Sequence, residues 1–177
     1  MSTPKDFQLI SKLGEGSYSS VYKVRRLSDN EIYAFKKVRM TTLNEKEKEN
    51  ALNEVRILAS IVDPYIIGYK ESFFDEDSSS LCIVMEYADG GDLQKKIQNA
   101  IDGKNFLPES MIWKCLIQLT QGLKTLHDMQ ILHRDLKCAN VFLSNDVYKI
   151  GDMNVSKVNK NEKTQKTLFL SFKTLRK

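Results

Sequence analysis

The chain has 177 residues, 41% of them hydrophobic and 28% charged, and 27 lysines and arginines against 23 aspartates and glutamates give a net charge of +4. This composition is that of an ordinary globular domain, and one domain is the default for this length. The small positive excess does not by itself indicate nucleic acid or a membrane as a partner. No apolar run approaches the roughly 20 residues that span a bilayer, and the N-terminus lacks a signal-peptide core, so we expect a soluble intracellular protein.

The three cysteines are Cys82, Cys115 and Cys138. Their positions show neither the pattern of a disulfide framework nor the paired ligand spacing of a zinc site. We therefore expect a protein of a reducing compartment.

The first half of the chain is predicted to be mainly β-structure. Three sequential antiparallel strands are expected at residues 7–13, 21–25 and 32–38. A charged stretch then leads into a helix whose apolar residues recur every three or four positions, at Ala51, Leu52, Val55, Leu58, Ala59 and Val62. Two more strands are expected at 66–74 and 81–86, on either side of an acidic, serine-rich turn.

The second half is predicted to be mainly helical. A short helix is expected at 93–100, and a longer one starts at Pro108 or Glu109 and ends near residue 127. The apolar stripe of the longer helix consists of Leu116, Leu119, Leu123 and Leu126. Two short extended segments, 141–143 and 147–150, flank a turn.

A glycine-containing turn between the first two strands is the first candidate binding element. It has the sequence Gly14-Glu15-Gly16-Ser17-Tyr18-Ser19. Glycine lets the backbone approach a phosphate without an intervening side chain. Taken alone, however, the motif favours an ordinary hairpin turn.

The order of the later motifs changes that interpretation. Ala34-Phe35-Lys36 ends the third strand, Glu54 lies on the charged helix, and Met85-Glu86-Tyr87 closes the fifth strand. The segment His133-Arg134-Asp135-Leu136-Lys137-Cys138-Ala139-Asn140 follows, and then Gly151-Asp152. In this order the chain resembles the catalytic domain of eukaryotic protein kinases from about residue 7 to about residue 157.

The resemblance implies an α+β, bilobal fold. Residues 7–86 would form an N-terminal lobe with five antiparallel strands and one helix, and 87–158 an incomplete, mainly helical C-terminal lobe. Residues 159–177 would be a divergent tail that lacks the helices expected to follow. That tail is open to two interpretations, a membrane-surface segment or a frame-shifted or intron-derived end.

The same resemblance implies a role for each polar motif residue in transferring phosphate from Mg-ATP to a serine or threonine of a protein. Lys36 would contact the α- and β-phosphates, with Glu54 holding its ammonium group. Asn140 and Asp152 would bind Mg²⁺. Asp135 would accept the proton of the substrate hydroxyl, and Lys137 would contact the γ-phosphate and indicate the serine/threonine class.

The nucleotide itself would be held by the phosphate loop and by an adenine site. The loop would contribute Gly14, Gly16 and Ser17. The adenine site would consist of Val21, Ala34, Met85, Glu86, Ala88 and Phe142, with the backbone of 86–88 binding the adenine edge. For any one apolar member, ordinary core packing explains the residue equally well. Leu58, Tyr69, His133 and Met153 would form an internal column joining the lobes.

Within the kinases, 51–55 and 87–97 resemble the NIMA-related family. The resemblance implies a cytoplasmic protein and leaves a cytoskeletal or ciliary association open; no nucleic-acid or membrane partner is expected. Ser19 in place of the loop's third glycine, and Met153 and Asn154 after Asp152, depart from the family pattern without precluding activity. The alternative function is an inactive nucleotide-binding or scaffold fragment.

Overall fold

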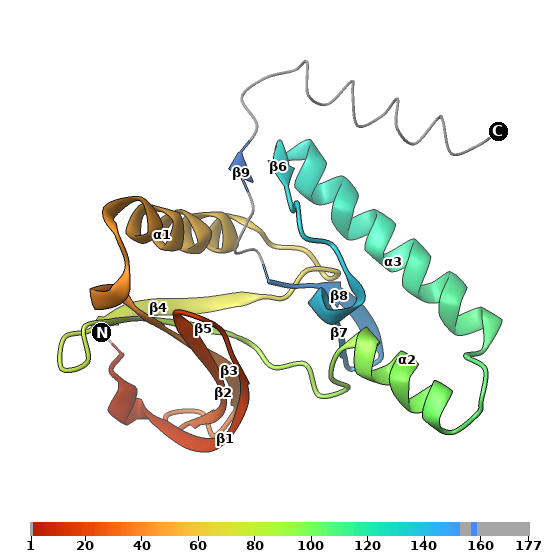
Figure 1. Ribbon diagram of the computed structural model, residues 1–177, viewed down its shortest axis with the longest axis horizontal. Coiled ribbons are helices and arrows are strands. Elements are labelled where there is room, and N and C mark those ends of the chain that lie inside the picture. Colours follow the sequence, from red (N-terminus) through yellow and green to blue (C-terminus); the bar gives the residue numbers. More distant parts are fainter. Residues whose placement is uncertain (1, 153–156, 159–177) are drawn as a thin grey trace.

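The protein is described by a computed structural model that covers residues 2–152 and 157–158, and its elements form two lobes that are joined after strand β5 (Figure 1). The N-terminal lobe holds β1 (Phe7–Glu15), β2 (Ser19–Arg26), β3 (Ile32–Arg39), α1 (Glu45–Ser60), β4 (Tyr69–Asp75) and β5 (Ser80–Glu86). The C-terminal lobe holds α2 (Leu93–Asp102), α3 (Glu109–Asp128), β6 (Ile131–Leu132), β7 (Val141–Ser144), β8 (Val147–Ile150) and β9 (Lys157–Val158). Three 3-10 turns complete the described elements: η1 (Pro4–Asp6), η2 (Met40–Thr42) and η3 (Cys138–Asn140).

The N-terminal lobe is one antiparallel sheet in the order β1-β2-β3-β5-β4, with α1 against one face. This confirms the predicted bilobal α+β fold with a five-stranded N-terminal lobe. Strand β4 begins at Tyr69 rather than at the expected Ile66. The reason is that Ile66 and Ile67 bond to the C-terminal lobe instead: the Ile67 amide donates to the carbonyl of Ile150 at 2.8 Å.

Helix α1 begins with a capping box. The side chain of Asn44 accepts from the amide of Glu47 at 2.9 Å, and the Glu47 carboxylate accepts from the amide of Asn44 at 2.9 Å. This exchange satisfies two backbone donors that a helix start leaves open. The predicted apolar face is wrong at Leu52, Ala59 and Val62, which are exposed. Leu52 and Ala59 lie on the outer side of α1, and Val62 follows the end of the helix.

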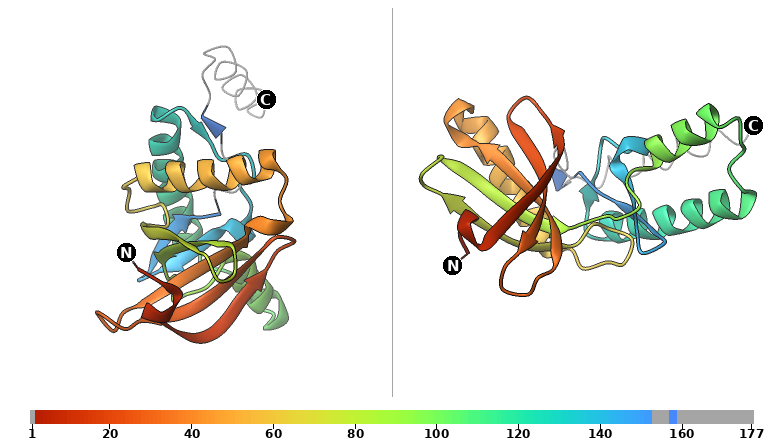
Figure 2. Two further views of the ribbon diagram at one scale, coloured as in Figure 1. Left: turned by 90° about the vertical axis from the view of Figure 1, so that its left-hand side faces the viewer. Right: turned by 90° about the horizontal axis from the view of Figure 1, so that it is seen from below.

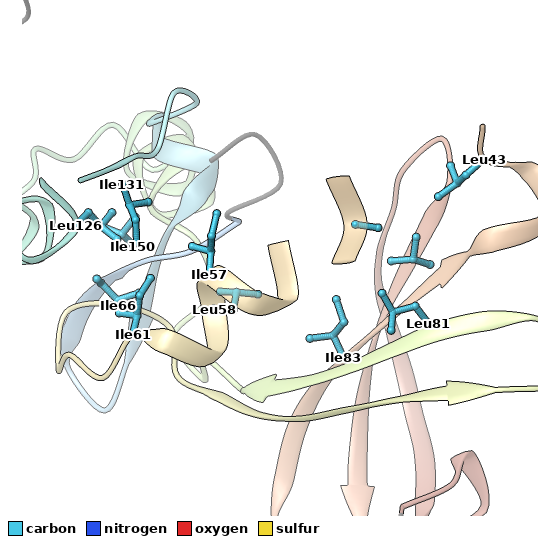
Figure 3. Packing of buried hydrophobic residues seen from close by; sticks show 12 residues of the cluster. Leu43, Ile57, Leu58, Ile61, Ile66, Leu81, Ile83, Leu126, Ile131 and Ile150 are labelled. Atoms are coloured by element: carbon cyan, nitrogen blue, oxygen red, sulfur yellow. The ribbon is translucent and has the colours of Figure 1, made fainter. Parts of the chain in front are cut away.

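The buried face of α1 consists of Ala51, Glu54, Ile57 and Leu58. Its apolar members belong to a hydrophobic core that continues through both lobes. Figure 3 shows Leu81 and Ile83 of the sheet near one end of this core and Leu126, Ile131 and Ile150 of the C-terminal lobe near the other, with Ile57 and Leu58 between them. Because the cluster is continuous, the sheet and α3 are held by packing as well as by the connecting segment.

Helix α3 lies at the far end of the molecule from the sheet, beside α2 (Figure 2). Leu119, Leu123 and Leu126 pack against the core as predicted, whereas Leu116 is 53% exposed, so the stripe is wrong at that position. At Gly122 the backbone of α3 lies close to the backbone of Tyr65. An added Cβ at this position would lie 2.9 Å from the carbonyl oxygen of Tyr65. The opposite side of α3 exposes Ile112, Trp113, Leu116 and Ile117. Among the described residues, no helix combines the length and apolar character that crossing a membrane requires.

Candidate active site

The phosphate-loop candidate is the hairpin turn between β1 and β2. The amide of Gly16 donates to the carbonyl of Ser19 at 2.7 Å and closes the turn. An added Cβ at Gly14 would meet no atom of the described chain within 4 Å, so packing does not account for this glycine. A cleft of 340 Å³ runs from the loop tip, Gly16 to Ser19, past Lys36 to the first half of α1. Of the residues predicted for the site, Gly16, Ser17, Lys36 and Glu54 line this cleft.

Lys36 and Glu54 form a buried ion pair at the floor of this cleft. Strand β3 alternates, so Lys36 faces α1 while Phe35 faces the opposite core. The Lys36 Nζ lies 2.8 Å from Glu54 Oε1, and both side chains are only 7% exposed. Burial raises the pKa of Glu54, the Lys36 charge and hydrogen bond oppose this rise, and Asp152 adds to it.

The segment before β7 brings the second group of polar residues together. Lys137 Nζ donates to Asp135 Oδ2 at 2.8 Å, and Asn140 Nδ2 donates to the Asp135 carbonyl at 2.8 Å and to Oδ2 at 3.1 Å. The hydrogen bond from Lys137 is the main cause that lowers the pKa of Asp135, with a smaller effect from Asn140. The carboxylate is therefore ionised at neutral pH, as a proton acceptor must be.

His133 and Gly151 connect this segment to Asp152. The imidazole of His133 is buried, and its Nε2 lies 2.8 Å from the carbonyl oxygen of Gly151. The Gly151 amide in turn donates to the carbonyl of Asn140 at 2.9 Å. His133 thus links the segment before β7 to the backbone just before Asp152, which fits the structural role expected for it as part of an internal column.

Asp152 lies between the two polar groups. Its Oδ1 is 3.8 Å from Lys36 Nζ. After the hydrogen bond from Lys137 to Asp135, the charge of Asp152 is a further cause that raises the pKa of Lys137. The backbone φ of Asp152 is 56°, a conformation that non-glycine residues adopt rarely and that often marks functional sites.

Asn140 and Asp152 have the chemistry of Mg²⁺ ligands. The Asn140 amide nitrogen donates to Asp135, to its carbonyl and to its carboxylate, and the amide oxygen is the atom of Asn140 that could bind a cation. Among residues 2–152 and 157–158, no group of three His, Cys, Asp or Glu side chains is arranged for a metal. An amide and a carboxylate nevertheless suit Mg²⁺, which usually keeps waters and phosphate oxygens as its remaining ligands.

The residues expected at the adenine site are half-buried and come from both lobes. Ala34 and Met85 are register partners on β3 and β5, Val21 lies on β2 and Phe142 on β7. An added Cβ at Gly151 would lie 2.7 Å from the Phe142 ring, so this glycine is required by packing.

Sequence reasoning missed Ser144 and Lys149, which bind the carboxylate of Glu86, because nothing in their spacing marks them.

The comparison with known protein families agrees with this geometry. A family model described as a protein kinase domain matches residues 7–173. The chain belongs to this family. The match runs past Lys157, near which the family pattern was expected to end. For the internal column of the kinase domain, Leu58 and His133 are buried and Tyr69 packs against the core, whereas Met153, like Asn154, lies outside the described residues.

The similar curated proteins are kinases named Nek, as the expected NIMA-related resemblance implies. Serine/threonine-protein kinase Nek1 of Mus musculus is 39% identical over 150 residues, which are 84% of this chain and 12% of that protein. Probable serine/threonine-protein kinase nek2 of Dictyostelium discoideum is 34% identical over 156 residues, 86% of this chain and 37% of that protein. Serine/threonine-protein kinase Nek11 of Homo sapiens is 37% identical over 155 residues, 86% of this chain and 24% of that protein. The chain therefore spans well under half the length of each of these relatives.

Proposed function

We propose that the protein transfers the γ-phosphate of ATP to serine or threonine hydroxyls of protein substrates; its relatives are named serine/threonine-protein kinases. One observation carries the proposal: Asp152 lies 3.8 Å from the buried Lys36–Glu54 pair and also acts electrostatically on Lys137, which binds Asp135. In this proposal two cations, Lys36 and Lys137, and two carboxylates, Asp135 and Asp152, act together on one triphosphate and its metal, which is the charge pattern that phosphoryl transfer requires.

In this proposal each side chain has a separate task. Lys36 binds the α- and β-phosphates, because Glu54 fixes its ammonium group at the floor of the cleft. Gly14, Gly16 and Ser17 cover the phosphates. Asn140 and Asp152 would hold Mg²⁺, which would supply positive charge to offset the negative charge that develops during transfer.

Asp135 orients the substrate hydroxyl and accepts its proton. Its low pKa keeps the carboxylate ionised, and its hydrogen bonds from Lys137 and Asn140 fix its direction. Lys137 is 55% exposed, so it is accessible to the γ-phosphate. A cation at this place stabilises the transferred group and supports the serine/threonine class.

The adenine ring would lie between Val21 and Ala34 on one side and Phe142 on the other, with Met85 at the back. The backbone of Glu86 and Ala88 would bind its edge. Protein substrates carrying serine or threonine, a cytoplasmic location and a cytoskeletal or ciliary association belong to the same proposal and follow from the family.

The second candidate function is an inactive nucleotide-binding or scaffold fragment. The exposed apolar side chains of α3 favour it, because a patch of this kind normally marks a surface that another segment or partner covers. In that case the cleft would bind ATP without transferring phosphate.

The test is transfer of radiolabelled phosphate from Mg-ATP to a generic protein substrate, with ATP affinity measured in parallel. Asp135→Ala should reduce transfer by about 100-fold or more while ATP still binds, since it removes the proton acceptor. The control Asp128→Asn changes an exposed carboxylate at the end of α3 that pairs with Lys124, and should have no effect. Equal rates for Asp135→Ala and wild type would refute the kinase proposal; ATP binding without any transfer by wild type would establish the second candidate instead.

A further inference from the structure

The carboxylate of Glu86, the last residue of β5, is held at three points and none of them belongs to the proposed nucleotide contacts. Ser144 donates its hydroxyl to Glu86 Oε1 at 2.7 Å, Lys149 donates its ammonium group to Oε2 at 2.8 Å, and the amide of Gly68 donates to Oε2 at 3.1 Å. The Glu86 and Lys149 side chains are 21% and 14% exposed. Burial would raise the pKa of Glu86, but these hydrogen bonds outweigh it and lower the pKa.

These three donors come from different parts of the fold. Ser144 and Lys149 lie on the two strands of the β7–β8 hairpin in the C-terminal lobe, and Gly68 precedes β4 in the N-terminal lobe. The backbone reinforces the last contact, because the Glu86 amide donates to the Gly68 carbonyl at 2.8 Å. One side chain of the N-terminal sheet therefore forms hydrogen bonds to both lobes. Glu86 ends strand β5, after which the chain crosses to the C-terminal lobe (Figure 1).

The segment after Glu86 is tied to the same hairpin. The Gly90 amide donates to the Leu143 carbonyl at 2.9 Å, and the Leu143 amide donates to the Gly91 carbonyl at 2.8 Å. The amide of Asn145 donates to the carboxylate of Asp89 at 2.9 Å. The crossing segment 86–91 is thus bound at both ends to residues 143–145, with Glu86 as the contact on the N-terminal side.

We propose that the Glu86 side chain is a positioning residue for nucleotide binding: clamped by Ser144, Lys149 and Gly68, it sets the backbone of 86–88 against the β7–β8 hairpin, which carries Phe142. This inference rests on the proposed function, because it assumes that this backbone binds adenine. The clamp acts on affinity for the adenosine part of ATP, since its three donors are Ser144, Lys149 and Gly68 and not the residues proposed to bind phosphate or metal. Loss of the clamp reduces the fraction of molecules in which segment 86–91 and the β7–β8 hairpin have the arrangement that binds adenine. The apparent affinity falls in proportion to that fraction.

The test measures the affinity of the 177-residue chain for Mg-ATP and for adenosine by calorimetry, well below its unfolding temperature. Lys149→Met should weaken both ligands by the same factor, about tenfold, because a charge-assisted contact is lost. Glu86→Gln should do the same, and the double variant should be no worse than either single one because both remove the same contact. Lys149→Arg should restore most of the affinity, which loss of packing alone would not predict. Hydrogen exchange of the amides of residues 86–91 should be faster in Lys149→Met.

The matched control is Lys114→Met. Lys114 of α3 pairs with Asp146 in the turn of the same hairpin, but both side chains are exposed and the pair is not one of the contacts of the clamp. ATP affinity should be unchanged. If Lys149→Met binds ATP and adenosine as tightly as wild type, the positioning inference is wrong while the kinase proposal stands. If wild type binds neither ligand, the proposed function fails and this inference with it.

Discussion

Replacing Lys36 by methionine should destabilise the fold as well as remove a phosphate contact. Lys36 Nζ and Glu54 Oε1 are 2.8 Å apart and both side chains are 7% exposed, so the variant leaves a buried carboxylate without this partner. Removing one member of a buried pair costs about 3–5 kcal/mol. For a chain of this size each kcal/mol lowers the unfolding temperature by about 2–4 °C, so a decrease of about 6–20 °C is expected.

The pH dependence of this loss has a definite sign. The pKa of Glu54 in the folded protein is already raised above its ordinary value of 4.5, and loss of Lys36 raises it further. A group whose pKa is raised on folding, such as Glu54, makes its full contribution to the stability of the fold below its pKa in the unfolded chain. That contribution is lost as the pH rises through its pKa in the folded protein. The deficit of Lys36→Met relative to wild type should therefore be smallest near pH 5 and should grow toward pH 8, by at most about 1.4 kcal/mol per pH unit.

Thermal and urea unfolding check this reasoning on wild type, Lys36→Met, the double variant Lys36→Met/Glu54→Leu and the control Lys12→Met. Lys36→Met/Glu54→Leu should recover most of the lost stability without recovering ATP binding, because it removes the buried charge but not the need for a phosphate ligand. The control Lys12→Met breaks the exposed pair with Glu15 and should cost no more than about 1 kcal/mol. A Lys36→Met variant that unfolds at the wild-type temperature at pH 8, or whose deficit does not change with pH, would refute the argument.

Three further predictions concern other parts of the chain. Asn44→Ala removes the acceptor for the Glu47 amide at the start of α1, and urea unfolding should show a loss of about 1 kcal/mol. Glu86 has a lowered pKa, so its contribution is complete above its ordinary value of 4.5 and is lost as pH falls through the folded pKa; the difference in unfolding temperature between wild type and Glu86→Gln should be constant from pH 8 to pH 6 and vanish in acid. Trp113→Lys on the exposed side of α3 should change the free energy of unfolding in urea by about 0.5 kcal/mol or less, because the Trp113 side chain is 55% exposed.

The sequence by itself determined the elements and the family. Alternating strands, the helix after Asn44 and the ordered motifs from Gly14 to Asp152 are local patterns, and each depends on residues within a few positions of one another. The five-stranded lobe and the mainly helical second lobe were predictable for that reason. So was the identity of Lys36, Glu54 and Asp135 as candidates, although their roles stay proposals.

The tertiary structure alone decided which faces are buried and which distant groups meet. The periodicity of α1 included Leu52 and omitted Glu54, because a charged residue is buried there only by virtue of Lys36 on another element. The meeting of Glu86 with Ser144 and Lys149 depends on the angle between the lobes. That angle is fixed by packing and hydrogen bonds between segments far apart in the chain, and no local spacing encodes it.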